Sequence, residues 1–594
     1  MSYRRKKLLA LFCATALSMT AVAGCTGTKS STGNVVSSET EVNAKETVAQ
    51  SETGTFSSAD MFTERDLAGT YEESGAVYVT LSGDGITGET DGVAINGQTV
   101  TITAEGTYIF SGTLSEGQIV VDADNAKVQI VFDNVDITCA SSAAVYVKSA
   151  EKVFVTLAEG AQNTLRNTDE YVAIDDNNID AVIFAKSDLT LNGTGSLTII
   201  SAEGHGIVSK DDLKIIGGTY DIIAAGHALS GKDSVRIADG TFILTAEKDG
   251  IHAENADDEE KGYIYIADGD FTITSDGDGM DASNIVQIED GTLDITAGGG
   301  AANSLKTHES DVPGGPGGGM PQNGEKLDGE SMPQMGEKPD GENMPQDTTT
   351  DESGTSTKGI KAGGGMYLNG GTYQIDSADD SIHSNANITI ADGTYTLATG
   401  DDGVHADDAL IVNGGTITVT ESYEGLEGLA VTINDGTIDI TASDDGINTA
   451  GEKMELNGGY IHILAGGDGV DSNGDLTING GEIYIDGPSD NGNSAIDYGD
   501  RSSAYVNGGT LVAIGSSGMA EVMSDSSKQK VLMVKLGEQM EAGNVVLTDS
   551  EGNVIVSYTA LKTYDCVIIS TAEVESGATY TLTTSGTTTE VTAE

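Results

Sequence analysis

Aspartate, glutamate and histidine recur at fixed spacings in the second half of the chain, where they could bind a metal or move a proton. The clearest motifs are DSIHS (380–384), DGVHA (402–406), EGLEG (424–428), DGINT (445–449) and DGVDS (468–472). Carboxylate oxygens at this density suit a hard cation such as Ca²⁺. An acid paired with a histidine could instead serve acid–base catalysis. Which chemistry applies depends on how the chain brings these motifs together.

The motifs belong to a repeat of about 22 residues. In each repeat, a Gly-Gly or Asp-Gly turn leads into a stretch such as GTYTL (393–397), whose apolar alternation is typical of a β-strand. The Asp-Gly motif forms a second short strand, and a run such as ALIVN (409–413) forms a third. Three short strands and three turns per repeat predict one coil of a parallel β-helix.

The repeat predicts an all-β fold with a parallel β-helix over residues 66–527, in which the N-terminal coils are β-rich but less regular. Residues 528–594 alternate as strands do and should form a C-terminal β cap, because a solenoid must close its open end. Residues 308–357 interrupt one coil with a low-complexity stretch that holds six of the seven prolines. We predict a disordered surface loop there, with a lid-like or adhesive appendage as the alternative.

Stacking the coils should gather the acidic motifs along one edge. Equivalent residues of neighbouring coils lie about 5 Å apart, and carboxylates at that distance repel unless a cation lies among them or some stay protonated. The predicted calcium ligands are Asp379, Asp380, Asp401, Asp402, Glu424, Glu427, Asp444, Asp445, Asp468 and Asp471. Alternatively, these aspartates accept N–H groups of the turns. We expect both roles along the edge.

Histidine or lysine follows the acids three residues later in several repeats. His252, His383 and His405 recur with the repeat, as residues of a scaffold do. Lys306 and Lys361 take the histidine position on either side of the insertion. A lysine beside bound calcium could abstract the proton next to a uronic acid carboxylate, so these two lysines are the candidate catalytic residues of a lyase. A non-catalytic role is the preferred interpretation.

The position after each Gly-containing turn forms a column of large apolar residues, which could be a sugar-stacking strip. Its members are Tyr220, Phe242, Phe271, Leu293, Tyr373, Tyr395, Ile417, Ile438, Ile461 and Ile483. Strand alternation places this column on the inward side, so core stacking is predicted. Cys139 and Cys566 lie at opposite ends of the repeat array and are predicted to be buried thiols without a disulfide.

The charge of the chain restricts its partners. Lys and Arg number 29 against 94 Asp and Glu, a formal net charge of −65. Such a field repels nucleic acid and attracts cations, so a polyanionic partner would need a metal bridge. We therefore expect no nucleic acid partner, and we expect a monomer.

The N-terminus reads as a targeting segment. SYRRKK is basic, LLALFCATALSMTA is apolar, and Val22-Ala23-Gly24-Cys25 resembles a bacterial lipobox. Residues 1–24 are thus predicted to be a lipoprotein signal peptide and Cys25 the lipidated residue, which would place the protein on the outer face of the cell membrane. An ordinary cleavable signal peptide is the alternative. Residues 25–65 are rich in Ser, Thr and Glu and predict a flexible tether.

Several motifs together resemble a known family. They are NSLKT (303–307), the long insertion, KGIKA (358–362), DDSIHS (379–384), YEGLEG (423–428) and DDGIN (444–448). Their succession resembles the bacterial carbohydrate-binding β-helix family, and the resemblance runs from about residue 66 to about residue 590. It implies a right-handed parallel β-helix with a pectate-lyase-like fold that binds calcium and polygalacturonate; cellulose binding is also attributed to the family.

Three hypotheses follow for the function. The leading one is a cell-surface lipoprotein that binds acidic plant polysaccharide, of the polygalacturonate or pectin kind, through calcium bridges. The second is a calcium-dependent polysaccharide lyase that uses Lys361 or Lys306. The third is a structural adhesin or spacer without a glycan ligand.

Overall fold

The computed structural model describes residues 55–593, apart from residues 84, 89–91, 307–355, 452 and 500. The predicted signal peptide, Cys25, most of the predicted tether and nearly all of the insertion lie outside the described residues. Within the described part, strands dominate, and the helical elements are η1 (Ser58–Asp60), α1 (Glu64–Ala68) and η2 (Ala301–Asn303). No helix in this part is both long and apolar enough to cross a membrane.

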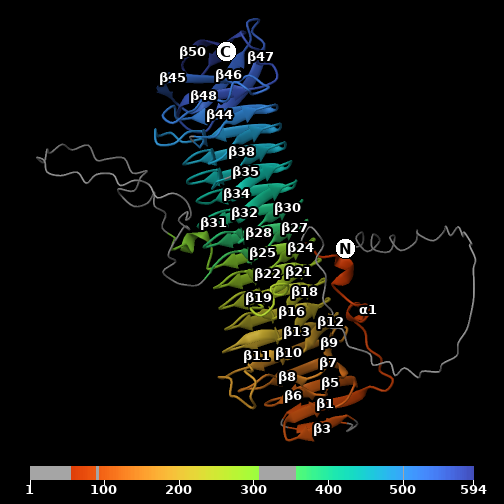
Figure 1. Cartoon of the computed structure of the whole chain (residues 1–594). Coiled ribbons are helices and arrows are strands. Elements are labelled where there is room, and N and C mark those ends of the chain that lie inside the picture. Colours follow the sequence, from red (N-terminus) through yellow and green to blue (C-terminus); the bar gives the residue numbers. More distant parts are fainter. Residues whose placement is uncertain are drawn as a thin grey trace, which may run out of the picture. The chain divides into compact units, whose positions relative to one another are not determined.

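Most strands fall into three columns, named here A, B and C, in which each strand pairs in parallel with its equivalent in the next coil. Column A follows the Gly-containing turns and consists of β10 (Gln162–Asn167), β13 (Ser196–Ser201), β16 (Thr219–Ala224), β19 (Thr241–Ala246), β22 (Asp270–Ser275), β25 (Thr292–Ala297), β28 (Thr372–Ser377), β31 (Thr394–Thr399), β33 (Thr416–Glu421), β35 (Thr437–Ala442), β38 (Tyr460–Ala465), β41 (Glu482–Asp486) and β44 (Thr510–Gly515). Figure 1 shows these strands succeeding one another along the stack.

Column B carries the Asp-Gly motifs and consists of β8 (Val145–Ser149), β11 (Ala181–Ala185), β14 (His205–Ser209), β17 (Leu229–Gly231), β20 (Ile251–Ala253), β23 (Met280–Ala282), β26 (Ile360–Ala362), β29 (Ile382–Ser384), the first halves of β32 (Val404–Val412) and β34 (Leu426–Ile433), β36 (Ile447–Thr449), β39 (Val470–Ser472) and β42 (Ile496–Tyr498).

Column C consists of β9 (Lys152–Leu157), β12 (Asp188–Gly193), β15 (Asp212–Ile215), β18 (Ser234–Ile237), β21 (Tyr263–Ile266), β24 (Val286–Ile288), β27 (Met366–Leu368), β30 (Ile388–Ile390), the second halves of β32 and β34, β37 (Met454–Leu456), β40 (Leu476–Ile478) and β43 (Ala504–Val506). The fold is therefore all-β, with a long and mostly parallel sheet whose pairing is that of a solenoid.

The pairing register explains the sequence period. Thr219 pairs with Thr241 in column A and Val404 with Leu426 in column B, an offset of one repeat in each case. The second residue of each turn is a glycine with a positive φ, for example 100° at Gly371 and 91° at Gly415, which a residue with a Cβ adopts only with strain. The turn chemistry and the parallel ladder thus fix the length of each coil together.

The large apolar column lies in the core, as predicted, and is not a sugar-stacking strip. Every member from Tyr220 to Ile483 is at most 2% exposed. The ring centroids of Tyr220 and Phe242 are 5.2 Å apart, and those of Tyr373 and Tyr395 are 4.5 Å apart. Cys139 and Cys566 are buried free thiols, in line with the sequence.

Both ends of the stack depart from the repeat. The N-terminal strands are β1 (Val77–Gly83), β2 (Gly85–Gly88), β3 (Val93–Asn96), β4 (Thr99–Ile102), β5 (Gly106–Leu114), β6 (Gln118–Asp122) and β7 (Lys127–Thr138), with antiparallel pairs β1–β2 and β3–β4. At the other end, β45 (Leu532–Met540) and β48 (Tyr564–Ser570) pair antiparallel, and β48 also covers β44. A separate antiparallel sheet contains β46 (Gly543–Thr548), β47 (Val554–Ala560), β49 (Thr579–Thr583) and β50 (Thr588–Thr592).

The end of the predicted tether is not flexible chain, which corrects the boundary at residue 65. Residues 55–68 pack along the outside of column C, where Phe56 N–H donates to Gln287 Oε1 at 2.7 Å and the Phe56 ring lies 4.3 Å from that of Tyr263. Asp66 in α1 is fully buried and accepts from Lys152 Nζ at 2.7 Å. Phe56 and Met61 are buried in this packing, and the polar contacts of Phe56 and Asp66 add to it.

Replacing Asp66 by Asn should destabilise this packing. Burial alone would raise the pKa of Asp66, but attraction and hydrogen bonding from Lys152, with help from Lys214 and Thr190, lower it to about 2. The stabilisation is therefore present above the ordinary aspartate pKa and is lost as pH falls towards 2. The variant leaves buried Lys152 unpaired, which should cost about 3–5 kcal/mol in denaturant unfolding at pH 7. Asp60→Asn, an exposed change in the same segment, should have no comparable effect.

Candidate functional site

Two positions of each coil place polar side chains along one edge of the stack, here called the acidic edge. The first position precedes column B and is held by His205, His227, Asp249, Asp278, Lys358, Asp380, Asp402, Glu424, Asp445, Asp468 and Ser494. The second lies three residues later, within column B, and is held by Ser230, His252, Asp281, Lys361, His383, His405, Glu427, Asn448, Asp471 and Asp497. Strand register alone therefore stacks these side chains.

Carboxylates at the first position connect neighbouring coils through the backbone. Asp380 Oδ1 accepts the N–H of Asp402 at 3.2 Å, Asp402 Oδ1 that of Glu424 at 3.1 Å, and Asp445 Oδ1 that of Asp468 at 2.6 Å. The expected role of these aspartates as acceptors of N–H groups near the turns is thus confirmed. It uses one oxygen of each carboxylate and leaves the other for a further partner.

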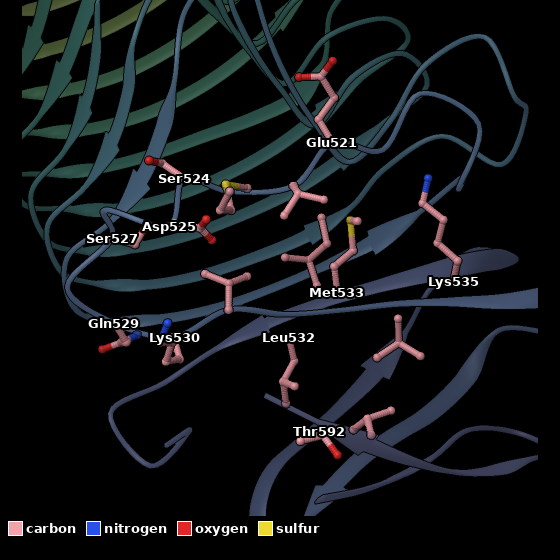
Figure 2. Close-up of a pocket in the computed structure, with 16 residues that line it drawn as sticks. Glu521, Ser524, Asp525, Ser527, Gln529, Lys530, Leu532, Met533, Lys535 and Thr592 are labelled. Carbon is pink, nitrogen blue, oxygen red and sulfur yellow. The ribbon is translucent and has the colours of Figure 1, made fainter. Parts of the chain in front are cut away.

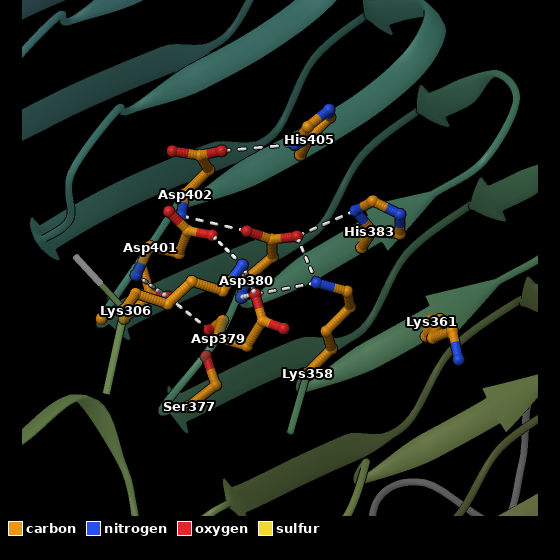
Figure 3. Close-up of polar contacts among 12 residues, drawn as sticks. Lys306, Lys358, Lys361, Ser377, Asp379, Asp380, His383, Asp401, Asp402 and His405 are labelled. Carbon is orange, nitrogen blue, oxygen red and sulfur yellow. Dashed lines mark hydrogen bonds and ion pairs between the residues drawn. The ribbon is translucent and has the colours of Figure 1, made fainter. Parts of the chain in front are cut away.

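Beside the insertion, lysines neutralise the edge. Lys306 Nζ lies 2.9 Å from Asp379 Oδ1 and 2.6 Å from Asp401 Oδ2, while Lys358 Nζ lies 2.8 Å from both Asp379 Oδ1 and Asp380 Oδ2 (Figure 3). Three of the predicted calcium ligands therefore surround ammonium groups. Lys306 precedes the insertion at residues 308–357, and Lys358 follows it.

The structure revises the places expected for the lysines. Lys361 does occupy the second position, with Nζ 3.3 Å from Asp281 Oδ1. Lys306 does not occupy the second position, because it lies outside column B, after η2. Its side chain reaches the acidic edge at Asp379. Sequence reasoning missed Lys358, although it replaces the aspartate of the repeated motif in KGIKA.

The environment of these lysines does not suit a general base. Burial disfavours the charged ammonium, but the surrounding carboxylates outweigh it and raise the pKa of Lys306, Lys358 and Lys361. A base must be unprotonated near its working pH. Each lysine here is held protonated, so it supplies positive charge and not proton abstraction.

Replacing Lys358 by Met should destabilise the coils beside the insertion. The change leaves Asp379 and Asp380, both nearly buried, without one cation, which should cost about 3–5 kcal/mol of unfolding free energy without calcium. Calcium should recover more stability in this variant than in the wild type, because the freed oxygens can bind it. Calorimetric melting with and without calcium measures both effects, and Lys453→Met, at an exposed pair with Glu455, is the control.

The next coils pair histidine with carboxylate. His383 Nδ1 lies 2.8 Å from Asp380 Oδ2, and His405 Nδ1 lies 3.2 Å from both Asp402 Oδ2 and Glu427 Oε2. Burial lowers the pKa of His405, but the hydrogen bond to Asp402 and the charges of Asp380 and Glu427 raise it to about 10. His405 therefore acts as a cation at neutral pH.

Further along, from Glu424 to Asp497, the edge contains carboxylates with Asn448 and Ser494 but no lysine, arginine or histidine. Oxygens of Asp445, Asp468 and Asp471 lie within 4.8 Å of one another. Burial first, and then neighbouring carboxylates, raise the pKa of these groups to about 8, 7 and 6 respectively. No Lys, Arg or His forms an ion pair with them among the described residues. A Cβ at Gly467 would lie 2.5 Å from Asp445 Oδ1, so the absence of a side chain there leaves room for that oxygen.

The ten predicted calcium ligands therefore fall into three environments. Lysine pairs with Asp379, Asp380 and Asp401, and histidine pairs with Asp402 and Glu427. Glu424, Asp444, Asp445, Asp468 and Asp471 remain without an ion pair in the described part of the chain. The arrangement fits an oxygen-ligated cation best at Asp445, Asp468 and Asp471.

A separate hollow lies where the last coils meet the cap strands. Its volume is ≈ 500 Å³, and residues 521–525 and strand β45 line much of it (Figure 2). Leu532 and Met533 give it an apolar wall, and none of the described lining residues is aromatic. It therefore offers neither a ring face for a sugar nor a group of carboxylates for a cation, and the acidic edge is the stronger candidate.

Comparison with known proteins identifies the family. A family described as "Carbohydrate-binding domain-containing protein" matches residues 96–403 and 401–553. These matches cover most of the 594 residues. The chain belongs to this family. The resemblance seen in the sequence is thereby confirmed at the level of the family, which is described as carbohydrate-binding.

Two known proteins are similar to parts of this chain. A carbohydrate-binding domain-containing protein of Acetivibrio thermocellus is 41% identical over 135 residues, which is 22% of this chain and 47% of that protein. The chain thus spans about half the length of that relative. The structure of a polysaccharide lyase-like protein from C. thermocellum, solved as a gadolinium derivative, has 36% sequence identity and a TM-score of 0.37, and the match covers 38% of this chain and 92% of that one.

Proposed function

We propose that this protein captures acidic polysaccharide, of the polygalacturonate or pectin kind, through calcium held on the acidic edge of a right-handed parallel β-helix. The observation that carries the proposal is the group of three carboxylates, Asp445, Asp468 and Asp471, whose oxygens lie within 4.8 Å of one another. Burial, and then the charges of neighbouring carboxylates, raise the pKa values of these groups, and a bound cation would relieve that repulsion.

The donor set favours calcium over other ions. The three side chains offer only oxygen, which hard cations prefer. Calcium takes six to eight oxygen ligands, so three carboxylates leave coordination places for water and for a partner. Uronic acid carboxylates could fill those places. A protein of net charge −65 would otherwise repel a polyanion, and a shared calcium ion removes that barrier.

The proposal includes the location of the protein. The basic and apolar N-terminal segment with Cys25 favours a lipid anchor that holds the protein on the outer face of the bacterial membrane. There a calcium-bridged β-helix would retain polysaccharide outside the cell. The same proposal treats the protein as a monomeric binder and not as a lyase, since the lysines that would serve as bases are held in ion pairs.

Retention on immobilised polygalacturonate tests this function. The purified protein should be retained in calcium and released by a chelator, and cellulose should show whether a neutral glycan is also bound. Equal retention with calcium and with chelator would contradict calcium bridging, and retention on neither glycan would remove both ligands. Unsaturated products after long incubation with calcium and polygalacturonate would favour a lyase instead.

A further inference from the structure

The acidic edge begins with histidines, several coils before the part of the edge that contains no lysine, arginine or histidine. His227 and Asp249 occupy the first position of successive coils, and His252 occupies the second position of the Asp249 coil. Asp249 Oδ2 lies 3.0 Å from His227 Nδ1 and 2.9 Å from His252 Nδ1. The two imidazole rings stack with centroids 4.1 Å apart. One carboxylate oxygen therefore lies between two ring nitrogens.

The hydrogen bonding of His227 indicates that its Nδ1 does not carry the positive charge that would pair with Asp249. The backbone N–H of Asp249 donates to His227 Nδ1 at 3.2 Å, so that nitrogen carries a lone pair and no proton. The same lone pair faces Asp249 Oδ2 at 3.0 Å. Two acceptors at that distance repel unless a cation lies between them. A protonated His252 can balance the carboxylate but cannot supply a proton to His227.

His205, one coil earlier, shows which contacts are needed to stack neighbouring coils. Its Nδ1 accepts the N–H of His227 at 2.8 Å, and its ring stacks on that of His227 at 4.8 Å. The next coil places a histidine, and not a carboxylate, beside that nitrogen. The inter-coil hydrogen bond thus needs only the histidine. Asp249 uses Oδ1 to accept the N–H of Asp278 in the following coil, so its second oxygen, Oδ2, and the imidazole of His252 go beyond what stacking the coils demands.

The donor set differs from that of the proposed calcium site. Two imidazole nitrogens and one carboxylate oxygen lie within 4.8 Å of one another, and Asp281 Oδ2 is a further 3.5 Å from His252 Nδ1. The side chains of His227, Asp249 and His252 are about 14–15% exposed, so an ion could reach them from solvent. Imidazole nitrogen is a preferred ligand of zinc and neighbouring first-row metals and a poor one for calcium.

We propose that His227, Asp249 and His252, with Asp281 as a fourth ligand, form a binding site for a first-row transition-metal dication such as Zn²⁺. The site is distinct in place and chemistry from the calcium site proposed above. Zinc bonds of about 2.0–2.2 Å need donors slightly further apart than they are here, a change that small side-chain rotations provide. The metal would link three successive coils through side chains, in addition to their backbone ladder.

Zinc titration of the full-length protein in millimolar calcium tests the site, because calcium then fills the oxygen-only positions. Isothermal titration should show one strong zinc-binding event in the wild type. His252→Gln and Asp249→Asn should each weaken it by at least about tenfold. Asn at position 249 can still accept the Asp278 N–H, which Asp249 Oδ1 now accepts at 3.0 Å, so the coil connection is kept. His405→Gln, in the other histidine and carboxylate group, is the matched control and should bind zinc as the wild type does.

The results separate cleanly. No zinc binding by the wild type, or wild-type zinc affinity in both His252→Gln and Asp249→Asn, overturns the site. Loss of the event in His405→Gln with retention in His252→Gln also overturns it, because the ion would then lie at Asp402 and Glu427. If Asp249→Asn melts at a far lower temperature than the wild type without metal, the result for His252→Gln decides alone.

A second measurement uses Co²⁺ in place of Zn²⁺, which should give visible absorption bands that His252→Gln changes. Polysaccharide retention is not part of the readout, so failure here leaves the proposed function untouched.

Discussion

Replacing Asp468 and Asp471 together by Asn is expected to abolish calcium-dependent retention on polygalacturonate. Both side chains contribute oxygens to the carboxylate-only group, and the change removes two of its three charges. Calcium affinity should fall by at least about tenfold. The fold should survive, because Asn at position 468 can still accept the Ser494 N–H that Asp468 Oδ1 accepts now. Retention on beads and calcium titration calorimetry measure the two effects.

A matched variant separates this site from overall charge. Asp270→Asn with Asp294→Asn removes the same two charges from exposed positions on column A strands β22 and β25. It should leave calcium binding and retention unchanged. If both double variants lose retention equally, the effect belongs to the charge of the molecule and not to the acidic edge. If the Asp468 and Asp471 variant binds polygalacturonate as the wild type does, the bridge lies elsewhere.

The stability of the calcium-free protein should fall as pH rises from about 4 to about 8. Burial and like charge raise the pKa of Asp471 to about 6, of Asp468 to about 7 and of Asp445 to about 8. Unfolded aspartate titrates near pH 3.9. Over the interval between these values the folded state binds more protons, so each increase in pH favours unfolding. The total loss should be on the order of several kcal/mol.

Saturating calcium should flatten this pH dependence, because the ion binds the charged carboxylates and removes the reason to keep their protons. Calorimetric melting at a series of pH values, with calcium and with chelator, measures the difference. The variant with Asn at positions 468 and 471 is the internal control, since Asn does not titrate, and its calcium-free stability should vary less with pH. A calcium-free wild type equally stable at pH 5 and pH 8 would contradict raised pKa values in this group.

The repetitive part of the fold was predictable from local pattern. Turn glycines such as Gly371 and Gly415 and the alternation of Tyr373 and Tyr395 recur with one period, and a parallel ladder is the structure in which that period repeats. Strand alternation alone was enough to predict that the apolar column faces the core. Likewise, stacking of the acidic motifs followed from the period, because equivalent positions must lie above one another once the coils pair.

The contacts made by residues outside the repeat could not be predicted from its period. Phe56 and Asp66 precede the repeat, and their docking on Gln287 and Lys152 joins parts of the chain far apart in sequence. Lys306 belongs to a departure from the repeat beside the insertion, so no periodic argument could place its ammonium between Asp379 and Asp401. These contacts depend on side chains that approach the stack from outside.

The sequence by itself determined that the coils stack, which residues face the core, and that carboxylates, histidines and lysines line one edge. Only the tertiary structure decided how those charges are matched. Lysine neutralises the edge at Asp379, histidine at Asp402, and no described cation does so at Asp445, Asp468 and Asp471. The physical reason is that periodicity fixes the backbone position of each residue, whereas a charge partner depends on distances of a few ångström between side chains, to which the Coulomb energy is steeply sensitive.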